Sequence, residues 1–243
     1  MQIRENNDAY MADLQAWLRE TANVPLEEMS AFFGARIGDY EAHMAQWEKA
    51  YACFAEHLPE NCPSILDLGC GTGLELQSVF ARFPNVHITG IDLSEKMLAE
   101  LRRNYAERNI ELICGNYFQI PFAEAHYDAV ISFQSLHHFS PQNKLTLFQK
   151  VYDCLKENGV FLECDYLACC DEEERLLFAE CARRRAVAGV SEDVFVHFDT
   201  PLTVSHESEL LYQAGFSEIR AVDSINGATF ILAEKTGTER KKA

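Results

Sequence analysis

Residues 65–73 contain the arrangement most suited to ligand chemistry, Ile-Leu-Asp-Leu-Gly-Cys-Gly-Thr-Gly. The apolar residues are typical of the buried end of a parallel strand, and Gly69, Gly71 and Gly73 then follow at alternate positions. Glycine suits such a turn because it accepts positive φ values and lets a ligand approach bare backbone. Apolar residues at helical spacing come next, so the segment predicts a strand, a glycine turn and a helix.

Two residues beside the glycines indicate which ligand the turn would take. The dinucleotide-binding fingerprint needs a third glycine where this chain has Leu74, so an NAD(P)-dependent oxidoreductase is the weaker alternative. Asp67 stands two residues before the first glycine, where its carboxylate would repel a pyrophosphate. The same charge would attract a ligand with an ammonium and a sulfonium group, as in S-adenosylmethionine.

Residues 66–73 resemble the first motif of the class I S-adenosylmethionine-dependent methyltransferases. The resemblance implies S-adenosylmethionine as cofactor and S-adenosylhomocysteine as product. It also implies that the cofactor is bound through Asp67, Gly69, Cys70, Gly71 and Gly73. The predicted function is methyl transfer to an O, N, S or C nucleophile of a small molecule. The alternatives are an S-adenosylmethionine-binding enzyme that does not methylate, and a pseudoenzyme or sensor.

Two further predicted strand ends carry residues suited to an adenosine ligand. Asp92 stands 23 residues after Gly69, where one carboxylate can accept hydrogen bonds from both ribose hydroxyls. Leu93 would pack on the adenine. Asn116 occupies the position at which the family usually has Asp for the adenine amino group, and its side-chain carbonyl can accept the same bond. Tyr117 is expected to flank the ring.

The fourth predicted strand ends in Ser-Phe-Gln-Ser-Leu-His-His, which also resembles the family and implies that Phe133 lies near the methionine part of the cofactor. His137 and His138 are the candidate catalytic residues, because a neutral imidazole at a strand end can take a proton from an incoming nucleophile. Adjacent histidines lack the i, i+4 spacing of common zinc ligand pairs, so we expect no metal. Asp165 and Tyr166, at the end of the fifth strand, are candidate substrate-binding residues.

Two outlying segments are expected to complete the substrate pocket. Tyr40 and His43 are three residues apart, so they share one face of a predicted helix. The resemblance implies that Tyr40 covers the methionine end of the cofactor, and His43 is a candidate for the substrate. His197 lies in an aromatic bend of residues 166–204, which we interpret as a lid over the substrate.

Strands and helices alternate from residue 65 onward, which predicts an α/β Rossmann-like, doubly wound sheet. Asn226-Gly227 is a strong hairpin signal between two late β-rich runs. The resemblance implies seven strands, mostly parallel, with an antiparallel C-terminal hairpin strand. The expected parallel strands lie near residues 65–68, 86–92, 110–114, 127–133 and 160–164, with Gly159 ending the helix before the last of them.

The first 60 residues show only helical patterns and are expected to form a cap of three helices. The first would be capped by Asp8, the second would begin at Pro25, and the third near Asp39. The predicted organisation is a cap (1–60), a cofactor-binding domain (61–235) and a flexible tail (236–243).

Composition restricts the partners and the compartment. A chain of 243 residues with a net charge of −17 is unsuited to nucleic acid or an anionic membrane, which favours a small-molecule substrate. The N-terminus is too polar for a signal peptide, and nine cysteines without a CxxC pair indicate free thiols in a reducing cytoplasm. Oligomeric state is left open, with a homodimer as one alternative.

Overall fold

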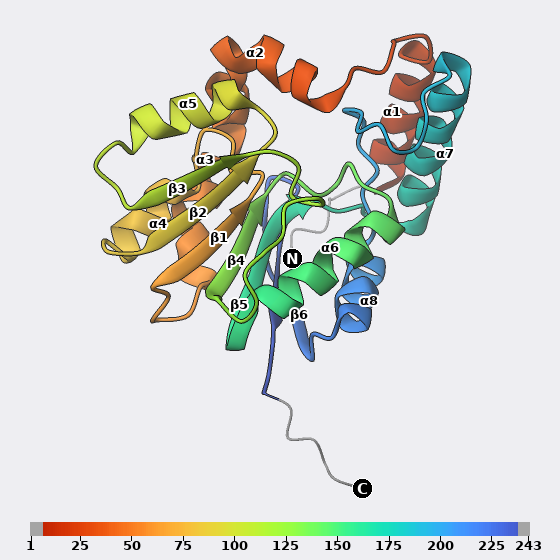
Figure 1. Cartoon of the computed structure of the whole chain (residues 1–243). Coiled ribbons are helices and arrows are strands. Elements are labelled where there is room, and N and C mark those ends of the chain that lie inside the picture. Colours follow the sequence, from red (N-terminus) through yellow and green to blue (C-terminus); the bar gives the residue numbers. More distant parts are fainter. Residues whose placement is uncertain (1–6, 238–243) are drawn as a thin grey trace, which may run out of the picture.

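A seven-stranded sheet in the order β3-β2-β1-β4-β5-β7-β6 is the frame of the protein, whose computed structural model describes residues 7–237 (Figure 1). Strands β1 to β5 are parallel, whereas β7 is antiparallel to both β5 and β6. The predicted fold class, including the antiparallel hairpin, is confirmed. The strands are β1 (Ser64–Leu68), β2 (His87–Asp92), β3 (Ile110–Cys114), β4 (Tyr127–Phe133), β5 (Leu155–Tyr166), β6 (Glu218–Ile225) and β7 (Ala228–Glu234).

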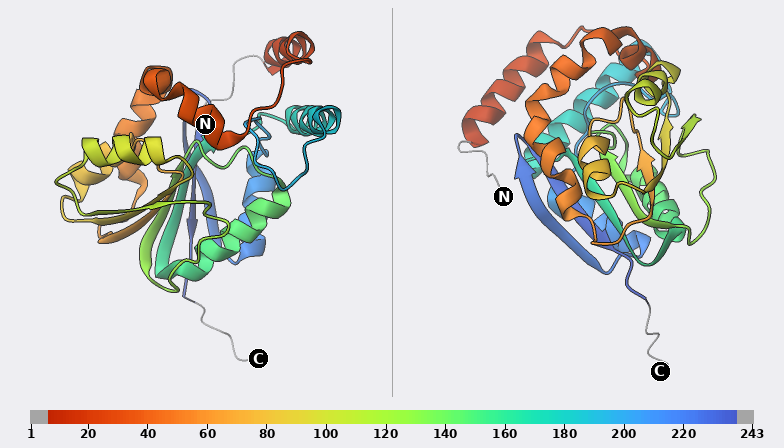
Figure 2. Two further views of the ribbon diagram at one scale, coloured as in Figure 1. Left: turned by 45° about the horizontal axis from the view of Figure 1, so that its top comes forward. Right: turned by 90° about the vertical axis from the view of Figure 1, so that its left-hand side faces the viewer.

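Helices cover both faces of this sheet (Figure 2). Helices α3, α4 and α5 lie over one face, and α6 and α8 over the other. No helix within residues 7–237 is long and apolar enough to cross a membrane. The helices are α1 (Asn7–Glu20), α2 (Met29–Met44), α3 (Glu48–Cys53), α4 (Leu76–Arg82), α5 (Glu95–Asn104), α6 (Pro141–Cys154), α7 (Asp171–Ala188) and α8 (Val204–Ala214), with 3₁₀ turns η1 (Ala45–Trp47) and η2 (Phe54–His57).

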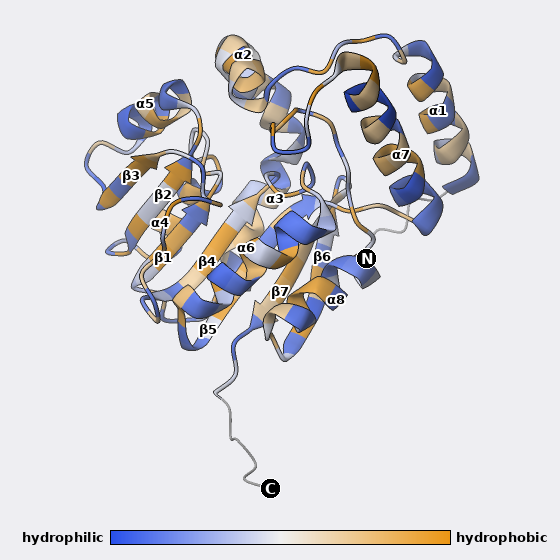
Figure 3. Ribbon diagram, turned by 45° about the vertical axis from the view of Figure 1, so that its right-hand side comes forward, coloured by the Kyte–Doolittle hydropathy of each residue, from blue (hydrophilic) through white to orange (hydrophobic). Residues whose placement is uncertain are grey.

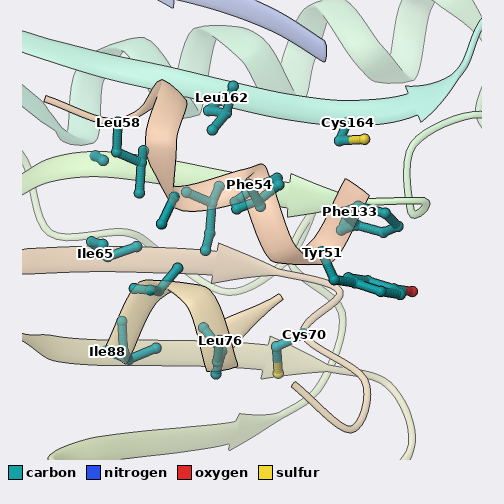
Figure 4. Packing of buried hydrophobic residues seen from close by; sticks show 14 of the residues in the cluster. Tyr51, Phe54, Leu58, Ile65, Cys70, Leu76, Ile88, Phe133, Leu162 and Cys164 are labelled. Carbon is teal, nitrogen blue, oxygen red and sulfur yellow. The ribbon is translucent and has the colours of Figure 1, made fainter. Parts of the chain in front are cut away.

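Successive side chains of a strand point to opposite faces of the sheet, so the apolar strands form two hydrophobic cores, one on each face. Ile65 of β1 packs with Phe54 and Leu76 on the α3–α4 side (Figure 4). Its neighbour Leu66 faces the other way and packs with Phe148 of α6. Figure 3 shows the same division by hydropathy, with hydrophobic strands and hydrophilic outer faces on α5 and α6. Because both faces are buried, the central strands are nearly continuous apolar runs.

Helices α1 and α7 form a third packed unit beyond the carboxyl ends of the strands, where they lie side by side (Figure 2). Met11 and Leu14 of α1 pack with Leu177 and Cys181 of α7. The hydroxyl of Tyr10 donates to Glu173, which adds a polar link between the two helices. Helix α1 is therefore held by the segment between β5 and β6.

The N-terminal helices begin and end at other residues than predicted. Helix α2 begins at Met29 rather than Pro25, because the Glu28 side chain accepts from the backbone N–H groups of Ser30 and Ala31 and so acts as the N-cap. The same helix continues through the position predicted for the start of a third helix. The predicted tail lies mostly outside the described residues, which end at 237.

The end of α6 also differs from the prediction. The helix ends at Cys154, and β5 begins at once because Leu155 is extended and pairs with Tyr127 of β4. The glycine expected to end the helix, Gly159, lies within β5, where an added Cβ would be 2.9 Å from the carbonyl oxygen of Lys156. Glycine is thus required for close backbone packing and not for a helix cap.

The sheet ends in the predicted hairpin. Asn226 and Gly227 both have positive φ, 50° and 81°, as a tight turn between twisted strands requires. Strand β6 forms one edge of the sheet, and its pairing with β7 shifts register between Ala221 and Asp223, which marks a bulge.

Candidate active site

The carboxyl ends of the parallel strands meet at one edge of the sheet. Strands β2 and β3 extend the sheet on one side of β1, and β4 and β5 on the other. The chain therefore changes direction between β1 and β4, and ligands of doubly wound folds bind in the crevice that such a switch creates.

The glycine turn after β1 presents bare backbone to this crevice. Gly69, Gly71 and Gly73 have φ values of 73°, 49° and 77°. A Cβ atom at Gly69 would lie 2.1 Å from Oγ of Ser135, so no side chain fits there. The turn is fixed to β2, because the Gly69 N–H donates to the carbonyl of Ile91 at 2.8 Å.

Two buried carboxyl groups lie behind the turn. Asp67 is 0% exposed, and neither of its oxygens has a hydrogen-bond donor among the described residues. Burial, and then the charge of Glu75, raise the pKa of Asp67 well above its usual range. Burial likewise raises the pKa of Glu75 to about 7. A buried acidic pair of this kind fits a cationic ligand.

Asp92 connects the end of β2 to the glycine turn. Its Oδ2 accepts from the Gly71 N–H at 3.0 Å, and its Oδ1 accepts from the Ser94 N–H at 2.7 Å. Burial raises the pKa of Asp92, and these two hydrogen bonds offset part of the rise. Each oxygen keeps a further lone pair, so the carboxylate can still accept from two ribose hydroxyls.

A cavity of about 580 Å³, including its open mouth, lies against this edge, and we name it the first cavity. Several residues of its wall are not apparent from the sequence, among them Met29 and Phe33 of α2, Met97 of α5, and Gln134 and Ser135 after β4. Helix α2 closes over the glycine turn, and an added Cβ at Gly71 would come within 3.3 Å of the Tyr40 hydroxyl. The predicted residues in the wall are Tyr40, Gly69, Gly71, Asp92, Leu93, Tyr117, Phe133 and His138.

Three other predicted cofactor residues point elsewhere. The side chain of Cys70 packs in the core, so that a Cβ at Gly90 would be 2.9 Å from its Sγ (Figure 4). Gly73 faces α5 rather than the cavity. Asn116 uses Oδ1 to accept from the Phe118 N–H at 2.9 Å, as in an Asx turn.

The candidate histidines lie after β4. Gln134 has φ of 50°, a conformation uncommon for a side-chain-bearing residue, and it redirects the chain as it leaves the strand. His137 is buried, and its Nδ1 is hydrogen-bonded to Oδ1 of Asp165. Burial disfavours the charged imidazole, but the Asp165 carboxylate outweighs it and raises the pKa of His137. Asp165 also accepts from the Leu136 N–H at 2.7 Å, so the pair is rigidly placed.

His138 differs from its neighbour in the direction of its pKa shift. Burial, and then the charge of His137, lower the pKa of His138, so its imidazole is neutral at physiological pH. Its Nδ1 lies 3.3 Å from Oδ1 of Asp199 and 3.3 Å from the carbonyl oxygen of Phe198. Asp199 was not predicted as a site residue. The signal available in the sequence was its place in the aromatic bend with His197.

The remaining predicted substrate residues are spread around this site. His197 stacks on Phe32 of α2 with ring centroids 3.5 Å apart, and its ring lies 4.9 Å from that of His138. The hydroxyl of Tyr166 donates to Glu173 of α7, and its ring lies 5.9 Å from that of His137. His43 is exposed on α2 beside Trp47, and the structure does not bring it to the cavity.

A second cavity, of about 1600 Å³ including its mouth, adjoins the first. His138 lines both cavities. Four aromatic side chains and several amides give the second cavity a mixed surface; they are Phe118, Phe139, Phe178, Phe195, Asn116 and Gln119. A small organic molecule with an apolar body and polar groups would suit such a wall.

The residues around the first cavity fit S-adenosylmethionine. The open glycine turn accommodates a ligand in van der Waals contact with backbone. Behind it, the buried carboxyl groups of Asp67 and Glu75 can favour a cationic group. Asp92 has lone pairs available for hydroxyl groups.

Comparisons with known proteins identify a methyltransferase domain in this chain. Residues 65–159 match the methyltransferase domain family. A malonyl-[acyl-carrier protein] O-methyltransferase of Priestia megaterium is 34% identical over 41% of this chain and 35% of its own length. A carboxy-S-adenosyl-L-methionine synthase of Wolinella succinogenes is 27% identical over 72% of this chain and 78% of its own length. Human N-acetylserotonin methyltransferase, solved with S-adenosylmethionine, has a similar fold, with a TM-score of 0.64 at 24% identity over 94% of this chain and 66% of that one. Residues 65–159 therefore carry a methyltransferase domain, and the relatives and the sheet order agree with this assignment.

Proposed function

We propose that this enzyme transfers the methyl group of S-adenosylmethionine to a small molecule that occupies the second cavity. The observation that carries the proposal is the position of His138, which stands in the walls of both cavities. The cofactor-binding turn and Asp92 lie on one side of it and the mixed apolar and amide surface on the other. A nucleophile beside His138 would then face the first cavity.

When bound, S-adenosylmethionine supplies an electrophilic methyl group on a sulfonium. The residues of this chain have the tasks of alignment, desolvation and proton transfer. The glycine turn and Asp92 orient the adenosine, and the buried acids Asp67 and Glu75 favour the cationic end. Tyr40, Met29 and Phe33 of α2 cover the cavity and limit the access of water.

The two histidines have different proposed roles. His138 is neutral and can accept the proton of a hydroxyl, amine or thiol nucleophile. His137 is held by Asp165 and fixes the loop that carries His138. We retain Asp165 and His197 as residues that shape the acceptor site.

Binding and turnover are tested separately. Isothermal titration calorimetry should show one molecule of S-adenosylmethionine or S-adenosylhomocysteine per chain. Incubation of the enzyme with methyl-labelled cofactor and fractionated metabolites should transfer label to a small molecule. Absence of cofactor binding up to millimolar concentration overturns the proposal, whereas binding without any product indicates a sensor or pseudoenzyme. NADH fluorescence enhancement would revive the oxidoreductase alternative.

A second candidate reaction follows from the relative in Wolinella, whose name is that of a synthase of carboxy-S-adenosyl-L-methionine. The alignment with that protein covers most of this chain, and the same cofactor site would serve an enzyme that modifies the cofactor's methyl group instead of donating it. Mass spectrometry of the nucleoside product distinguishes the two reactions. Methyl transfer yields S-adenosylhomocysteine, whereas the alternative, which needs a second substrate as carboxyl donor, yields a cofactor heavier by CO₂.

The organisation and location of the chain are further parts of the proposal. Residues 1–60 act as a cap and 166–204 as a lid on the cofactor-binding part at 61–235. Nine free thiols support a reducing compartment such as the cytoplasm, and the net charge of −17 supports a partner other than nucleic acid. A homodimer remains one of the alternatives for the assembly.

A further inference from the structure

Three potential metal ligands converge beside the two cavities. Nδ1 of His138 lies 3.3 Å from Oδ1 of Asp199, and Nε2 of His137 lies 3.5 Å from the same oxygen. One ligand atom from each residue lies within 4.8 Å of the others. Both measured separations are long for hydrogen bonds of this type, which are strongest near 2.8 Å.

The separations suit a shared cation better than direct hydrogen bonds. Nitrogen and oxygen ligands lie about 2.0–2.2 Å from a zinc ion, so two ligands of a tetrahedral site are about 3.3–3.5 Å apart. The two distances to Asp199 fall in that interval. Two imidazoles and one carboxylate are also the ligand set of catalytic zinc sites, which leave a fourth position open.

The surroundings of His137 favour metal binding as well. Because Asp165 engages Nδ1, the Nε2 atom is the one that faces Asp199. Metal-binding histidines almost always have their second nitrogen held by a carboxylate or carbonyl in this way. The Thr200 N–H donates to the His137 carbonyl at 2.7 Å, which fixes the segment that carries Asp199 against the histidine loop.

We propose that His137, His138 and Asp199 bind one divalent transition-metal ion of the zinc type, with an open position toward the acceptor. The role assigned to the ion rests on the proposed methyl transfer, but the existence of the binding site does not. The proposed site also replaces the expectation of no metal, which considered only the spacing of the two histidines. The third ligand comes from a different segment, which the fold brings beside them.

The ion would give the acceptor site a Lewis acid. A hydroxyl or thiol acceptor would bind at the open position, its O–H or S–H bond would break with the electron pair staying on the heteroatom, and the proton would leave to solvent. The bound anion would then be the nucleophile. In this state His138 is a ligand through Nδ1 and does not accept the proton itself.

The test uses the full chain, stripped with a chelator and then titrated with Zn²⁺ alone by calorimetry and with Co²⁺ by visible absorption. We expect one ion per chain and the absorption of a tetrahedral N/O site. Asp199→Asn should abolish the Co²⁺ absorption and weaken Zn²⁺ binding by at least about 100-fold, since loss of an outer partner alone costs 10–100-fold. The Asp199 side chain is 44% exposed, so this variant is expected to fold.

Two controls locate the ion. Asp193→Asn removes an exposed acid of the segment that carries Asp199, and this variant should bind Zn²⁺ as the parent does. His57→Ala removes the other cluster of potential ligands among the described residues, Cys53, His57 and Asp223, and should also leave binding intact. The inference is overturned if Zn²⁺ does not bind below millimolar concentration, if Asp199→Asn binds it normally, or if binding is lost in His57→Ala.

Cofactor titrations of the same proteins separate this inference from the proposed function. S-adenosylmethionine binding without metal binding overturns the metal site alone. Metal binding without S-adenosylmethionine binding leaves the ion in place and removes the methyl-transfer role.

Discussion

Asp92 is the residue whose substitution tests the cofactor site most directly. Its carboxylate joins the glycine turn to the end of β2 and is placed to accept from a ribose. Asp92→Ala should weaken S-adenosylhomocysteine binding by about 1.5–3 kcal/mol, the range for hydrogen bonds to a charged group. Calorimetry on Asp92→Ala and on Glu95→Ala, which removes an exposed acid of the same region, gives the comparison. Equal affinity in the two variants would exclude Asp92 from the site.

Glu75 should make both stability and cofactor binding depend on pH. Its pKa in the folded chain is about 7 against an ordinary 4.5, so the folded chain binds more protons than the unfolded chain between these values. The free energy of unfolding should therefore fall as the pH rises from about 4.5 to 7, and Glu75→Gln should lessen this fall. Urea denaturation across that pH range measures the free energy of unfolding. Glu209→Gln, at an exposed position of α8, is the control.

Affinity for the cationic cofactor should change in the opposite direction, because deprotonation of the Asp67–Glu75 pair increases its attraction for an ammonium group. A cofactor affinity that is flat between pH 6 and pH 8 in the parent chain would contradict this assignment.

His138 should affect turnover more than cofactor binding. Proton transfer by a placed side chain contributes about 10²–10⁴-fold, so His138→Ala should lose turnover in that range while S-adenosylhomocysteine affinity changes little. His126→Ala, at an exposed histidine, is the matched control. Turnover within about threefold of the parent would show that His138 has no such role. The Zn²⁺ titration distinguishes loss of a base from loss of a ligand.

Helices α6 and α8 are joined by a buried ion pair. Nζ of Lys144 contacts both carboxylate oxygens of Glu207, at 2.7 and 2.8 Å, and both side chains are 0% exposed. Lys144→Met should lower the free energy of unfolding by about 3–5 kcal/mol, because it leaves a buried carboxylate without its cation. The half-exposed pair of Lys156 and Asp128 provides the control, and Lys156→Met should cost less than about 1 kcal/mol. If urea denaturation showed similar losses of unfolding free energy in the two variants, burial would not determine the strength of these ion pairs.

Helix α2 and the segment 191–200 should respond together to the cofactor. The Met29 N–H donates to the carbonyl of Phe195 at 3.0 Å, and the His197 N–H donates to Glu27 at 2.9 Å, so the two segments are hydrogen-bonded to each other. Since α2 also lines the first cavity, S-adenosylhomocysteine should increase hydrogen-exchange protection in residues 36–47 and 191–200. Helix α8 serves as the unaffected reference. Protection confined to residues 65–139 would show that both segments are static.

Across the whole chain, the sequence was most informative where a local pattern and the fold demand the same residue. The glycines after β1 and the Asn226-Gly227 turn were predictable because few residues accept positive φ. Asp92 was predictable because the strand order fixes where its carboxylate must lie. Asp199 was not, since only the path of the segment between β5 and β6 brings it to His138. The start of α2 was also missed, because a glutamate cap at residue 28 is less distinctive than a proline.

The bulge in β6 has a consequence for how copies of this protein could associate. Within residues 7–237 the sheet has two outer strands, β3 and β6, and an outer strand can recruit another chain by continuing the ladder of backbone hydrogen bonds. In β6 the register shift between Ala221 and Asp223 twists the backbone, and Arg220 adds a charge. Both features oppose strand addition. Pairing of two copies through their β6 strands is therefore disfavoured.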